Sequence, residues 1–263
     1  MKKEYKPILS TFERMADAYS RSSGMEEVNR RSLAPIPKEW EGRILDVGAG
    51  AGAFIEKYVD PAKHEIYTVD FSMGMIRQTA ARLGEMVGSC VFPTRALAQA
   101  LPFPRDAFDA ALCVNTLHNM PSREDIRLAV SEMARVIRPR GALLLEFRNS
   151  ENPARKRISE MYDTPELPQK SFTFEEVSKM LGQIGLETVS RIPIWGDYVP
   201  SGPWEDAIER LKTPFRKMPP ERAPRFAAIA IKPPGFRSSL MTAFALDETN
   251  HDQELEESTH FPE

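Results

Sequence analysis

The stretch RILDVGAGAGAF, residues 43–54, constrains the fold of this chain more than any other segment. A short apolar run, of the kind that forms a buried parallel strand, leads into Asp46 and then into Gly48, Gly50 and Gly52. Glycines at this spacing permit a sharp turn after a strand and let the backbone approach a ligand closely. The stretch therefore predicts the end of a first buried strand, followed by a ligand-binding turn.

Strand and helix signals alternate along the rest of the chain. Apolar or β-branched runs predict further strands at residues 65–70, 89–95, 108–114, 142–147, 186–194 and 225–233. Apolar residues at helical spacing predict helices at residues 52–59, after Ser72, after Ser122 and after Thr173, where Glu176 completes a capping box. Strands that alternate with helices in this way predict a parallel α/β sheet.

The composition is that of an ordinary soluble protein, and it argues against two classes of function. The 263 residues carry a net charge of −3, so the overall charge does not favour nucleic acid as a partner. No window approaches ~18 consecutive apolar residues, and we expect a cytoplasmic protein without signal peptide or membrane span. The two cysteines, Cys90 and Cys113, lie in apolar runs, so we expect reduced core thiols and no metal site.

The chain divides into three expected parts. Residues 1–42 precede the first strand and contain a segment with helical spacing of apolar residues. Residues 43–235 form the main domain, which includes a proline-rich insert at 195–224. Residues 236–263 hold seven acids and one base, so we expect a disordered, acidic tail.

The glycine turn and a second acid point to an adenosine-bearing cofactor. In a parallel α/β sheet, ligands bind beyond the carboxyl ends of the strands, beside the first strand. Asp70 ends the second strand, where an acid can accept both hydroxyl groups of a ribose. The glycine spacing also fits a dinucleotide fingerprint, but the Asp46 carboxylate would repel a pyrophosphate. It suits an ammonium group, such as the amino-acid end of S-adenosylmethionine (SAM).

Five segments resemble motifs of the class I SAM-dependent methyltransferases, in particular the group around the quinone C-methyltransferases. In chain order they are FERMADAYS, LDVGAGAG, VDFSMGMI, ALPFPRDAFDAALCVNTLHNM and EMARVIRPRGALLLEF. The resemblance covers roughly residues 12–232 and implies a Rossmann-like, doubly wound sheet of seven strands, mostly parallel with the last strand antiparallel. It also implies that residues 1–42 form a helical lid and that the 195–224 insert caps the substrate pocket.

The resemblance assigns roles to individual residues. Asp70 would hold the ribose, Met75 would lie on the adenine, and Tyr19 would lie near the cofactor. Leu97 stands where the family often has an acid that binds the adenine amino group, so Gln99 or a backbone amide is expected to serve instead. The complete predicted cofactor-binding set is Tyr19, Asp46, Gly48, Ala49, Gly50, Asp70, Phe71, Met75, Leu97, Ala98 and Asn115.

Methyl transfer from a sulfonium needs a nucleophile held in line with the methyl group, and a general base only if that nucleophile keeps a proton. His118, just after the fourth strand, is the candidate catalytic base, although a histidine there can also serve only in packing. Arg148 could bind an anionic substrate or form a salt bridge at the sheet edge. Trp195 and Tyr198 could line the substrate pocket or merely pack the insert, and His64 is expected in a surface turn.

The sequence therefore predicts an enzyme that moves a methyl group from SAM to an O or N atom of a small-molecule acceptor, of natural-product or glycan type, with S-adenosylhomocysteine (SAH) as product. One alternative is a C-methyltransferase for a quinone or lipid-like ring, which an apolar pocket without a base would favour. Another is a non-catalytic SAM-binding regulatory protein. A nicotinamide oxidoreductase is disfavoured by Asp46. The sequence does not identify the acceptor, and it leaves a homo-oligomer open.

Overall fold

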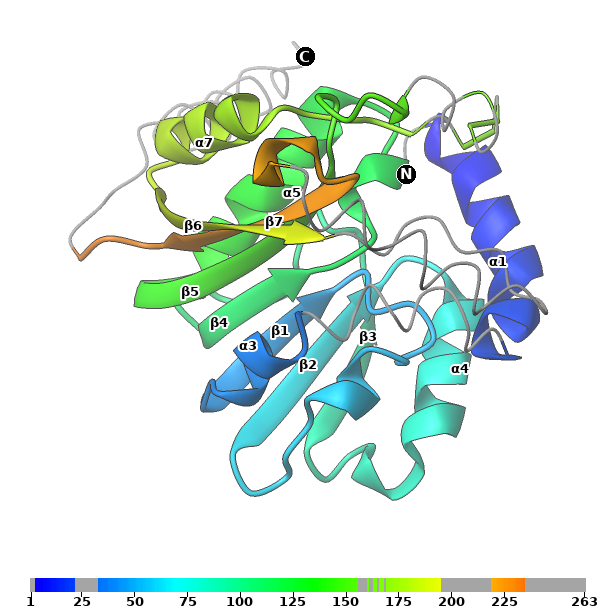
Figure 1. Cartoon of the computed structure of the whole chain (residues 1–263). Helices are drawn as coiled ribbons and strands as arrows, with labels where there is room; N and C mark the ends of the chain where they lie inside the picture. The colour runs from blue at the N-terminus through cyan, green and yellow to red at the C-terminus, as the bar shows by residue number, and fades with distance from the viewer. Residues whose placement is uncertain are drawn as a thin grey trace, which may run out of the picture.

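The fold is built on a seven-stranded sheet with the order β3-β2-β1-β4-β5-β7-β6 (Figure 1). The structure is a computed structural model, and it describes residues 3–21, 33–155, 160, 163–164, 166–167, 169–194 and 219–234. The strands are β1 (Gly42–Val47), β2 (His64–Asp70), β3 (Val91–Arg95), β4 (Phe108–Cys113), β5 (Ile137–Arg148), β6 (Glu187–Ile194) and β7 (Arg225–Ile231). Strand β7 is antiparallel to both β5 and β6, and the other neighbours are parallel, which confirms the predicted fold.

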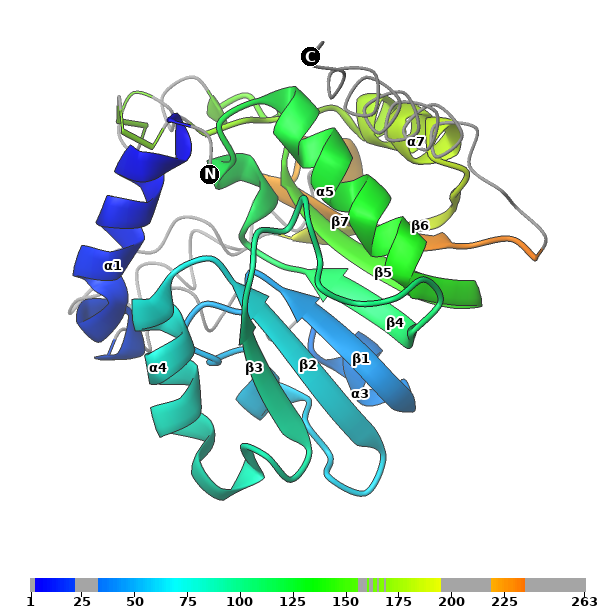
Figure 2. The ribbon, with the colours of Figure 1, turned by 180° about the vertical axis from the view of Figure 1, so that it is seen from behind.

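Helices cover both faces and one end of this sheet (Figures 1 and 2). The α-helices are α1 (Tyr5–Arg21), α3 (Pro35–Lys38), α4 (Met73–Leu83), α5 (Arg123–Val136) and α7 (Phe174–Gln183). Short 3-10 helices are η1 (Ile55–Lys57), η2 (Gly84–Met86), η3 (Leu117–Asn119) and η4 (Pro220–Arg222). No helix among the described residues is long and apolar enough to cross a bilayer.

Local capping signals set the starts of three helices. The side chain of Ser72 accepts a hydrogen bond from the Met75 N–H at the start of α4, and the side chain of Ser122 accepts one from the Asp125 N–H at the start of α5. Thr173 and Glu176 form the predicted capping box at the start of α7, with both reciprocal hydrogen bonds present. The caps satisfy N–H groups that would otherwise lack partners in the first turn, so the helix starts follow directly from the sequence.

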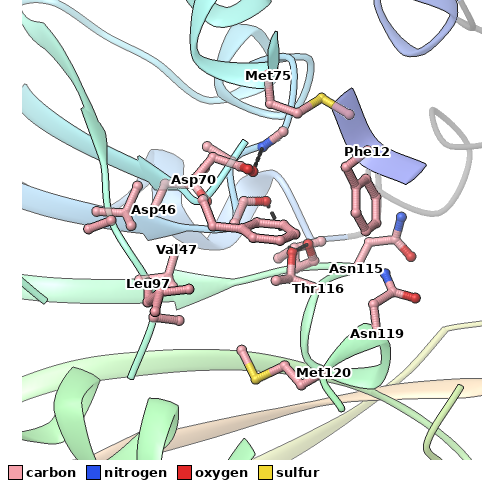
Figure 3. A pocket seen from close by; sticks show the side chains of 18 of the residues that line it. Phe12, Asp46, Val47, Asp70, Met75, Leu97, Asn115, Thr116, Asn119 and Met120 are labelled. Carbon is pink, nitrogen blue, oxygen red and sulfur yellow. Dashed lines mark hydrogen bonds between the residues drawn. The ribbon is translucent and has the colours of Figure 1, made fainter. Parts of the chain in front are cut away.

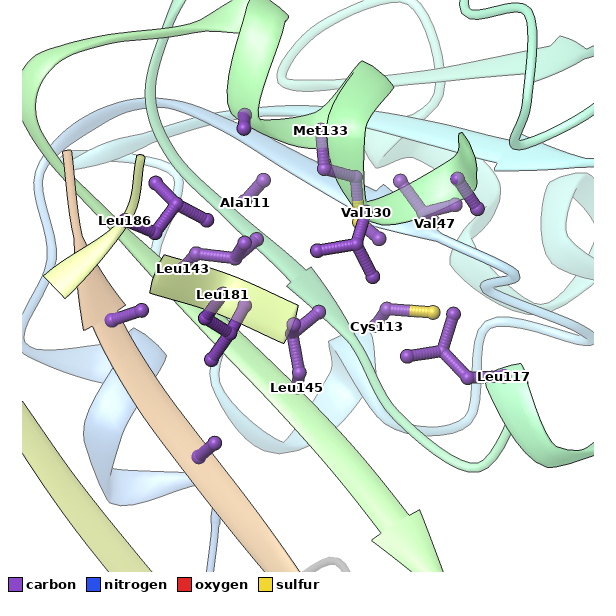
Figure 4. Packing of buried hydrophobic residues seen from close by; sticks show 14 of the residues in the cluster. Val47, Ala111, Cys113, Leu117, Val130, Met133, Leu143, Leu145, Leu181 and Leu186 are labelled. Atoms are coloured by element: carbon purple, nitrogen blue, oxygen red, sulfur yellow. The ribbon is translucent and has the colours of Figure 1, made fainter. Parts of the chain in front are cut away.

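The larger hydrophobic core lies between the sheet and helices α5 and α7 (Figure 4). Val130 and Met133 of α5 and Leu181 of α7 are fully buried against Leu143 and Leu145 of β5. Each fully buried side chain of this size stabilises the fold by about 1.5–3 kcal/mol relative to its exposed state. This core fixes β4 and β5, whose carboxyl ends lead into the candidate site.

A second core covers the opposite face of the sheet. There, Ile44, Ile66 and Leu112 of the central strands pack against Phe54 and Tyr58 from the segment after the glycine turn. Because alternate residues of β1 point into the two cores, the strand is buried on both sides and reads as a continuous apolar run. Burial on both faces therefore fixes the carboxyl end of β1, where Asp46 lies.

Two expectations for local structure were wrong. Residues 52–59 form only the short helix η1 rather than a longer α-helix, because Gly52 has φ +75° and the segment ends within a few residues at Asp60 and Pro61. Strand β5 starts directly after α5 instead of at residue 142. Residues 138–141 thus belong to β5, but they bulge out of its pairing with β4, which shifts from Phe108–Ile137 to Ala110–Ala142.

His64 is buried rather than placed in a surface turn. Its side chain is only 3% exposed at the start of β2. The Nδ1 atom accepts a hydrogen bond from the Asp60 N–H at 3.0 Å, and Nε2 lies 2.9 Å from the carbonyl oxygen of Trp40. Since a carbonyl only accepts, Nε2 carries the proton. His64 thus joins the turn before β2 to the segment before β1, a contact that no local pattern indicates.

Several expectations fall on residues that the structure does not describe. Trp195, Tyr198, most of the 195–224 insert and the acidic tail lie outside the described ranges, as does the side chain of Tyr19. The proposed division into lid, domain, insert and tail therefore stays a prediction. Cys90 and Cys113 are free, buried thiols, as expected.

Candidate functional site

A pocket opens where the chain reverses direction across the sheet. Strand β1 lies between β2 and β4, so the chain leaves β1 toward one side and returns on the other, and ligands bind at such a switch point. The space between its walls, together with the open solvent at its mouth, amounts to about 970 Å³. Its wall comes from the carboxyl ends of these three strands, the segment after β3, and helix α1 (Figure 3).

The structure brings together nearly all of the predicted cofactor residues. Ten of them line this single pocket: Asp46, Gly48, Ala49, Gly50, Asp70, Phe71, Met75, Leu97, Ala98 and Asn115. The eleventh, Tyr19, belongs to α1, and its side chain is not described. The predicted set therefore occupies one site, and the contacts of its members with a cofactor stay predictions.

Two glycines of the turn are required by its geometry. Gly48 has φ +75°, and a Cβ atom there would lie 2.3 Å from the side chain of Thr116, whose Oγ1 donates a hydrogen bond to the Gly48 carbonyl at 3.0 Å. Gly50 has φ +56°, and the position of its missing Cβ is open space. The turn thus packs tightly against the loop after β4 at Gly48, whereas the space beside the Gly50 backbone is open.

Asp70 ties the glycine turn to the second strand. Its Oδ2 accepts a hydrogen bond from the Gly50 N–H at 3.0 Å, and its Oδ1 accepts one from the Ser72 N–H at 2.9 Å. Burial raises the pKa of this carboxyl from 3.8 to about 6, with a smaller contribution from the charge of Glu13, while the backbone hydrogen bonds oppose the rise. A carboxylate has about four acceptor sites, and the N–H groups of Gly50, Ser72 and Phe71 do not use all of them, so acceptor capacity remains for a ligand hydroxyl.

Asp46 lies at the carboxyl end of β1 with its side chain 3% exposed. Its Oδ2 accepts a hydrogen bond from the Tyr58 hydroxyl at 3.2 Å. Burial, followed by the charge of Asp46, raises the pKa of Tyr58 well above its ordinary value, so the phenol remains a neutral donor. This donor helps to compensate for the burial of a carboxylate, and it keeps Asp46 at the pocket wall.

A buried network holds the loop after β4. Glu146 at the end of β5 accepts hydrogen bonds from the Asn115 N–H at 2.9 Å and from Arg225 at 2.6 Å. Arg225 also donates to the Asn115 side-chain oxygen at 2.9 Å. Asn115 has φ +56°, a conformation that asparagine tolerates better than most residues, and the network fixes it there. The sequence alone did not indicate this role of Arg225 and Glu146.

The far end of the pocket combines apolar side chains with the amides of Gln99, Asn115 and Asn119 and the Tyr5 hydroxyl. Tyr5, Ile8 and Phe12 lie on one face of α1 and line the pocket together with Met120 and Asn119. Their spacing of three and four residues was a signal for a buried face, although it could not show what that face covers. Asn115 and Asn119 lie side by side below Phe12, away from Asp46 (Figure 3).

Gln99 makes a contact different from the one expected. It lines the pocket, but its side-chain amide donates a hydrogen bond to the Tyr5 hydroxyl and lies 3.7 Å from the Met120 sulfur. The amide therefore connects the segment after β3 to helix α1. Recognition of adenine by Gln99 stays a prediction, and the backbone near Leu97 and Ala98 lines the same part of the pocket.

His118 and Arg148 do not line the pocket. His118 lies in η3 with its side chain 3% exposed, and its Nε2 is 3.3 Å from Arg148 Nη2. Because a guanidinium only donates, Nε2 must be the acceptor and Nδ1 carries the proton. Burial, followed by the charges of Arg148, Arg225 and Arg155, lowers the pKa of His118 well below its ordinary value. The roles of His118 as base and of Arg148 as substrate anchor stay predictions.

The charges that line the pocket are of one sign. Among the described residues, Asp46 and Asp70 are the charged side chains of the lining, and no lysine, arginine or histidine lines it. Among the residues that the structure describes, no group of three or more His, Cys, Asp or Glu side chains could hold a metal ion. The pocket thus suits a ligand that carries positive charge and hydroxyl groups at the end where the two acids lie.

Comparisons with known sequences agree with this geometry. Residues 45–145 match the model of a protein family described as a methyltransferase domain, and this match confirms the predicted resemblance. The chain is 33% identical over 152 residues to the ubiquinone/menaquinone biosynthesis C-methyltransferase UbiE of Geobacter sulfurreducens, covering 56% of this chain and 58% of that protein. It is 35% identical over 105 residues to the uncharacterized methyltransferase YcgJ of Bacillus subtilis, covering 40% of each. The alignments therefore span about half the length of these relatives or less.

Solved structures with a similar fold cover more of the chain. A methyltransferase solved in complex with the Trm112 methyltransferase activator of Haloferax volcanii has a TM-score of 0.65 at 17% identity, covering 84% of this chain and 97% of that one. The 1,6-didemethyltoxoflavin-N1-methyltransferase of Burkholderia thailandensis, solved with SAH, has a TM-score of 0.55 at 17% identity, covering 86% and 85%. At these identities, the likeness establishes the fold.

The position of His118 gives a direct prediction. We expect His118→Ala to lower the free energy of unfolding by about 1–3 kcal/mol, because it removes a buried side chain and the acceptor of one Arg148 N–H group. The affinity for SAH should change by less than about twofold, because His118 does not line the pocket. Chemical denaturation and titration calorimetry measure the two quantities. A variant of unchanged stability that has lost methyl transfer would instead support the role of His118 as base.

Proposed function

We propose that this protein is a SAM-dependent methyltransferase that acts on an uncharged small molecule. The observation that carries the proposal is a glycine-lined pocket at the sheet's switch point, whose charged lining consists of Asp46 and Asp70, in a domain that matches a methyltransferase family. Bound SAM would supply an electrophilic methyl group on a sulfonium. The protein would supply orientation, desolvation and charge complementarity, which such a displacement requires.

The residues present fit this cofactor. A buried carboxylate at Asp46 suits the ammonium of the amino-acid end, and Asp70 has acceptor capacity left for a ribose hydroxyl. The open space at Gly50 would allow close approach of the ligand to the backbone. Phe71 and Met75 offer apolar surface for the adenine ring. The net positive charge of SAM matches the two acids, whereas a pyrophosphate would be repelled by Asp46.

The acceptor would occupy the far end of the pocket, below helix α1. Phe12, Ile8 and Met120 offer surface for a ring, and the Asn119 side chain offers an amide for one polar group. An anionic acceptor would have to be desolvated near two carboxylates without a cation from the described lining. These features support an uncharged acceptor and not the anionic one that Arg148 would have bound.

Two classes of nucleophile are compatible with this pocket. An O or N atom of a small molecule is the first, as the sequence predicts. The second is a carbon atom of a quinone-like ring, and two observations favour it: the described lining contains no histidine that could act as a base, and the chain is similar over about half its length to a C-methyltransferase for ubiquinone and menaquinone biosynthesis. The position of the new methyl group in the product would distinguish the two.

Removing the Asp70 carboxylate should weaken cofactor binding. We expect Asp70→Ala to raise the Kd for SAH at least about tenfold, or about 1.4 kcal/mol, because a ligand hydroxyl and the Gly50 N–H lose their acceptor. Titration calorimetry with SAM, SAH and NAD measures this, with Asp60→Ala, in the turn before β2, as the control. Binding of NAD alone by the wild type would refute the proposed function.

The raised pKa of Asp70 predicts a pH dependence. The ionised carboxylate accepts ligand hydroxyls, and with a pKa of about 6 it becomes protonated as the pH falls through 6. The affinity for SAH should therefore be full at pH 7.5 and about tenfold weaker at pH 5. Calorimetry at both pH values tests this, and Asp70→Asn should bind weakly with little change between them. A wild-type affinity that is constant over this range would contradict the assignment.

The charge of the acceptor can be tested with size-matched fragments. We expect 4-ethylphenol to bind the SAH-loaded protein more tightly than 4-ethylbenzoate by about 1 kcal/mol or more, because the lining offers acids and no described cation. Saturation-transfer NMR measures both affinities. Asn119→Leu should reduce the preference for the phenol over 4-ethylanisole. Tighter binding of the benzoate would show that a cation outside the described residues completes the pocket.

A further inference from the structure

Helix α1 is fastened to the first turn of α4 by one carboxylate. Glu13 accepts hydrogen bonds from the N–H groups of Met73 at 2.7 Å and of Gly74 at 2.9 Å. These are two of the N–H groups that a helix leaves without intrahelical partners, and Ser72 satisfies a third, that of Met75. The N-terminus of α4 is therefore capped in part by Glu13, which lies 60 residues earlier in the sequence than Met73.

The contact surface around Glu13 is close-packed. A Cβ atom at Gly74 would lie 2.8 Å from Glu13 Oε2 and 2.9 Å from Ala16 Cβ, so the glycine allows the two helices to meet. Ala16 is 3% exposed and packs with Met75 and Ala51. Farther along α1, Asp17 accepts a hydrogen bond from the Gln78 side chain at 2.7 Å. Polar and apolar contacts thus hold α1 on α4 in one position.

This fastening lies directly beside the cofactor end of the pocket. Asp70 and Phe71 immediately precede the capped turn of α4, and the charge of Glu13 contributes to the environment of Asp70. The residue before Glu13, Phe12, meets the ring of Phe71 edge-on with centroids 5.9 Å apart, and both line the pocket. A ligand that touches Asp70, Phe71 and Phe12 therefore contacts both parts that Glu13 joins.

We propose that Glu13 is a positioning residue that couples cofactor binding to the docking of helix α1 over the pocket. The proposal rests on the proposed function. A ligand that contacts Phe12 as well as Asp70 binds the docked state more tightly than the undocked one. Because coupling is reciprocal, the factor by which the ligand favours docking equals the factor by which docking strengthens ligand binding, and a change that loosens α1 weakens binding by at most this factor.

The experiment measures both sides of this coupling in the full chain. Hydrogen exchange reports the opening of α1 with and without SAH, and calorimetry reports the Kd for SAH. In Glu13→Ala, the α1 amides should exchange faster without ligand and the Kd should rise, each by about fivefold. Glu13→Gln keeps one acceptor oxygen and should fall between this variant and the wild type. Arg14→Ala, at the exposed neighbouring position, should change neither quantity.

A second variant approaches the contact from the other helix. Gly74→Ala replaces neither Glu13 nor any residue of the pocket lining, and it should reproduce the effects of Glu13→Ala by pushing α1 away from α4. Gly182→Ala is the matched control, since the corresponding Cβ in α7 would meet nothing within 4 Å. Unchanged exchange in β1 and β4 shows that the variants are folded.

The outcomes separate the two proposals. Exchange of α1 that SAH does not slow in the wild type, together with an unchanged Kd for SAH in Glu13→Ala and Gly74→Ala, would show that Glu13 holds the helix without coupling and would overturn the inference. Unchanged exchange of α1 in both variants would overturn it as well, because Glu13 would not hold the helix. If the wild type itself fails to bind SAH, the proposed function falls, while exchange without ligand still decides whether Glu13 holds α1.

Discussion

The candidate site depends above all on the Asp70 carboxylate. Its two oxygens hold the N–H groups of Gly50 and Ser72, so one side chain joins the glycine turn after β1, the end of β2 and the start of α4. Burial makes these bonds matter more, because in a dry environment an unpaired polar group is costly. The same carboxylate faces the pocket, so the group that shapes the turn is also available to a ligand.

The charges around the carboxyl edge of the sheet are divided between two regions. The acids Asp46 and Asp70 line the pocket, whereas Arg148 and Arg225 lie behind it, near His118 and Glu146. The buried pair of Glu146 and Arg225 fixes the loop after β4, and breaking such a pair by removing one partner typically costs about 3–5 kcal/mol. The basic side chains thus help to fix the segments around the pocket, while the charged side chains that line it are negative.

Local signals predicted the parts of the fold that local physics controls. The strands followed from apolar runs, and the helix starts followed from Ser72, Ser122 and the box at Thr173, because caps act within three residues of their partners. The helix expected at 52–59 did not form, because Gly52 has a positive φ and the segment that follows it is only a few residues long. His64 was misjudged because one of its two hydrogen-bond partners, the carbonyl of Trp40, comes from a distant segment.

The sequence by itself determined which residues surround the pocket's cofactor end, since Asp46, the glycines and Asp70 end strands that a parallel sheet must place at one edge. Only the tertiary structure decided what closes that pocket and which side chains stay out of it. Helix α1 lines it and is joined to α4 by Glu13, and His118 lies beside Arg148 outside the lining. The reason is that the strands and the turns after them follow from short-range patterns, whereas the orientation of each side chain depends on partners far away in the sequence.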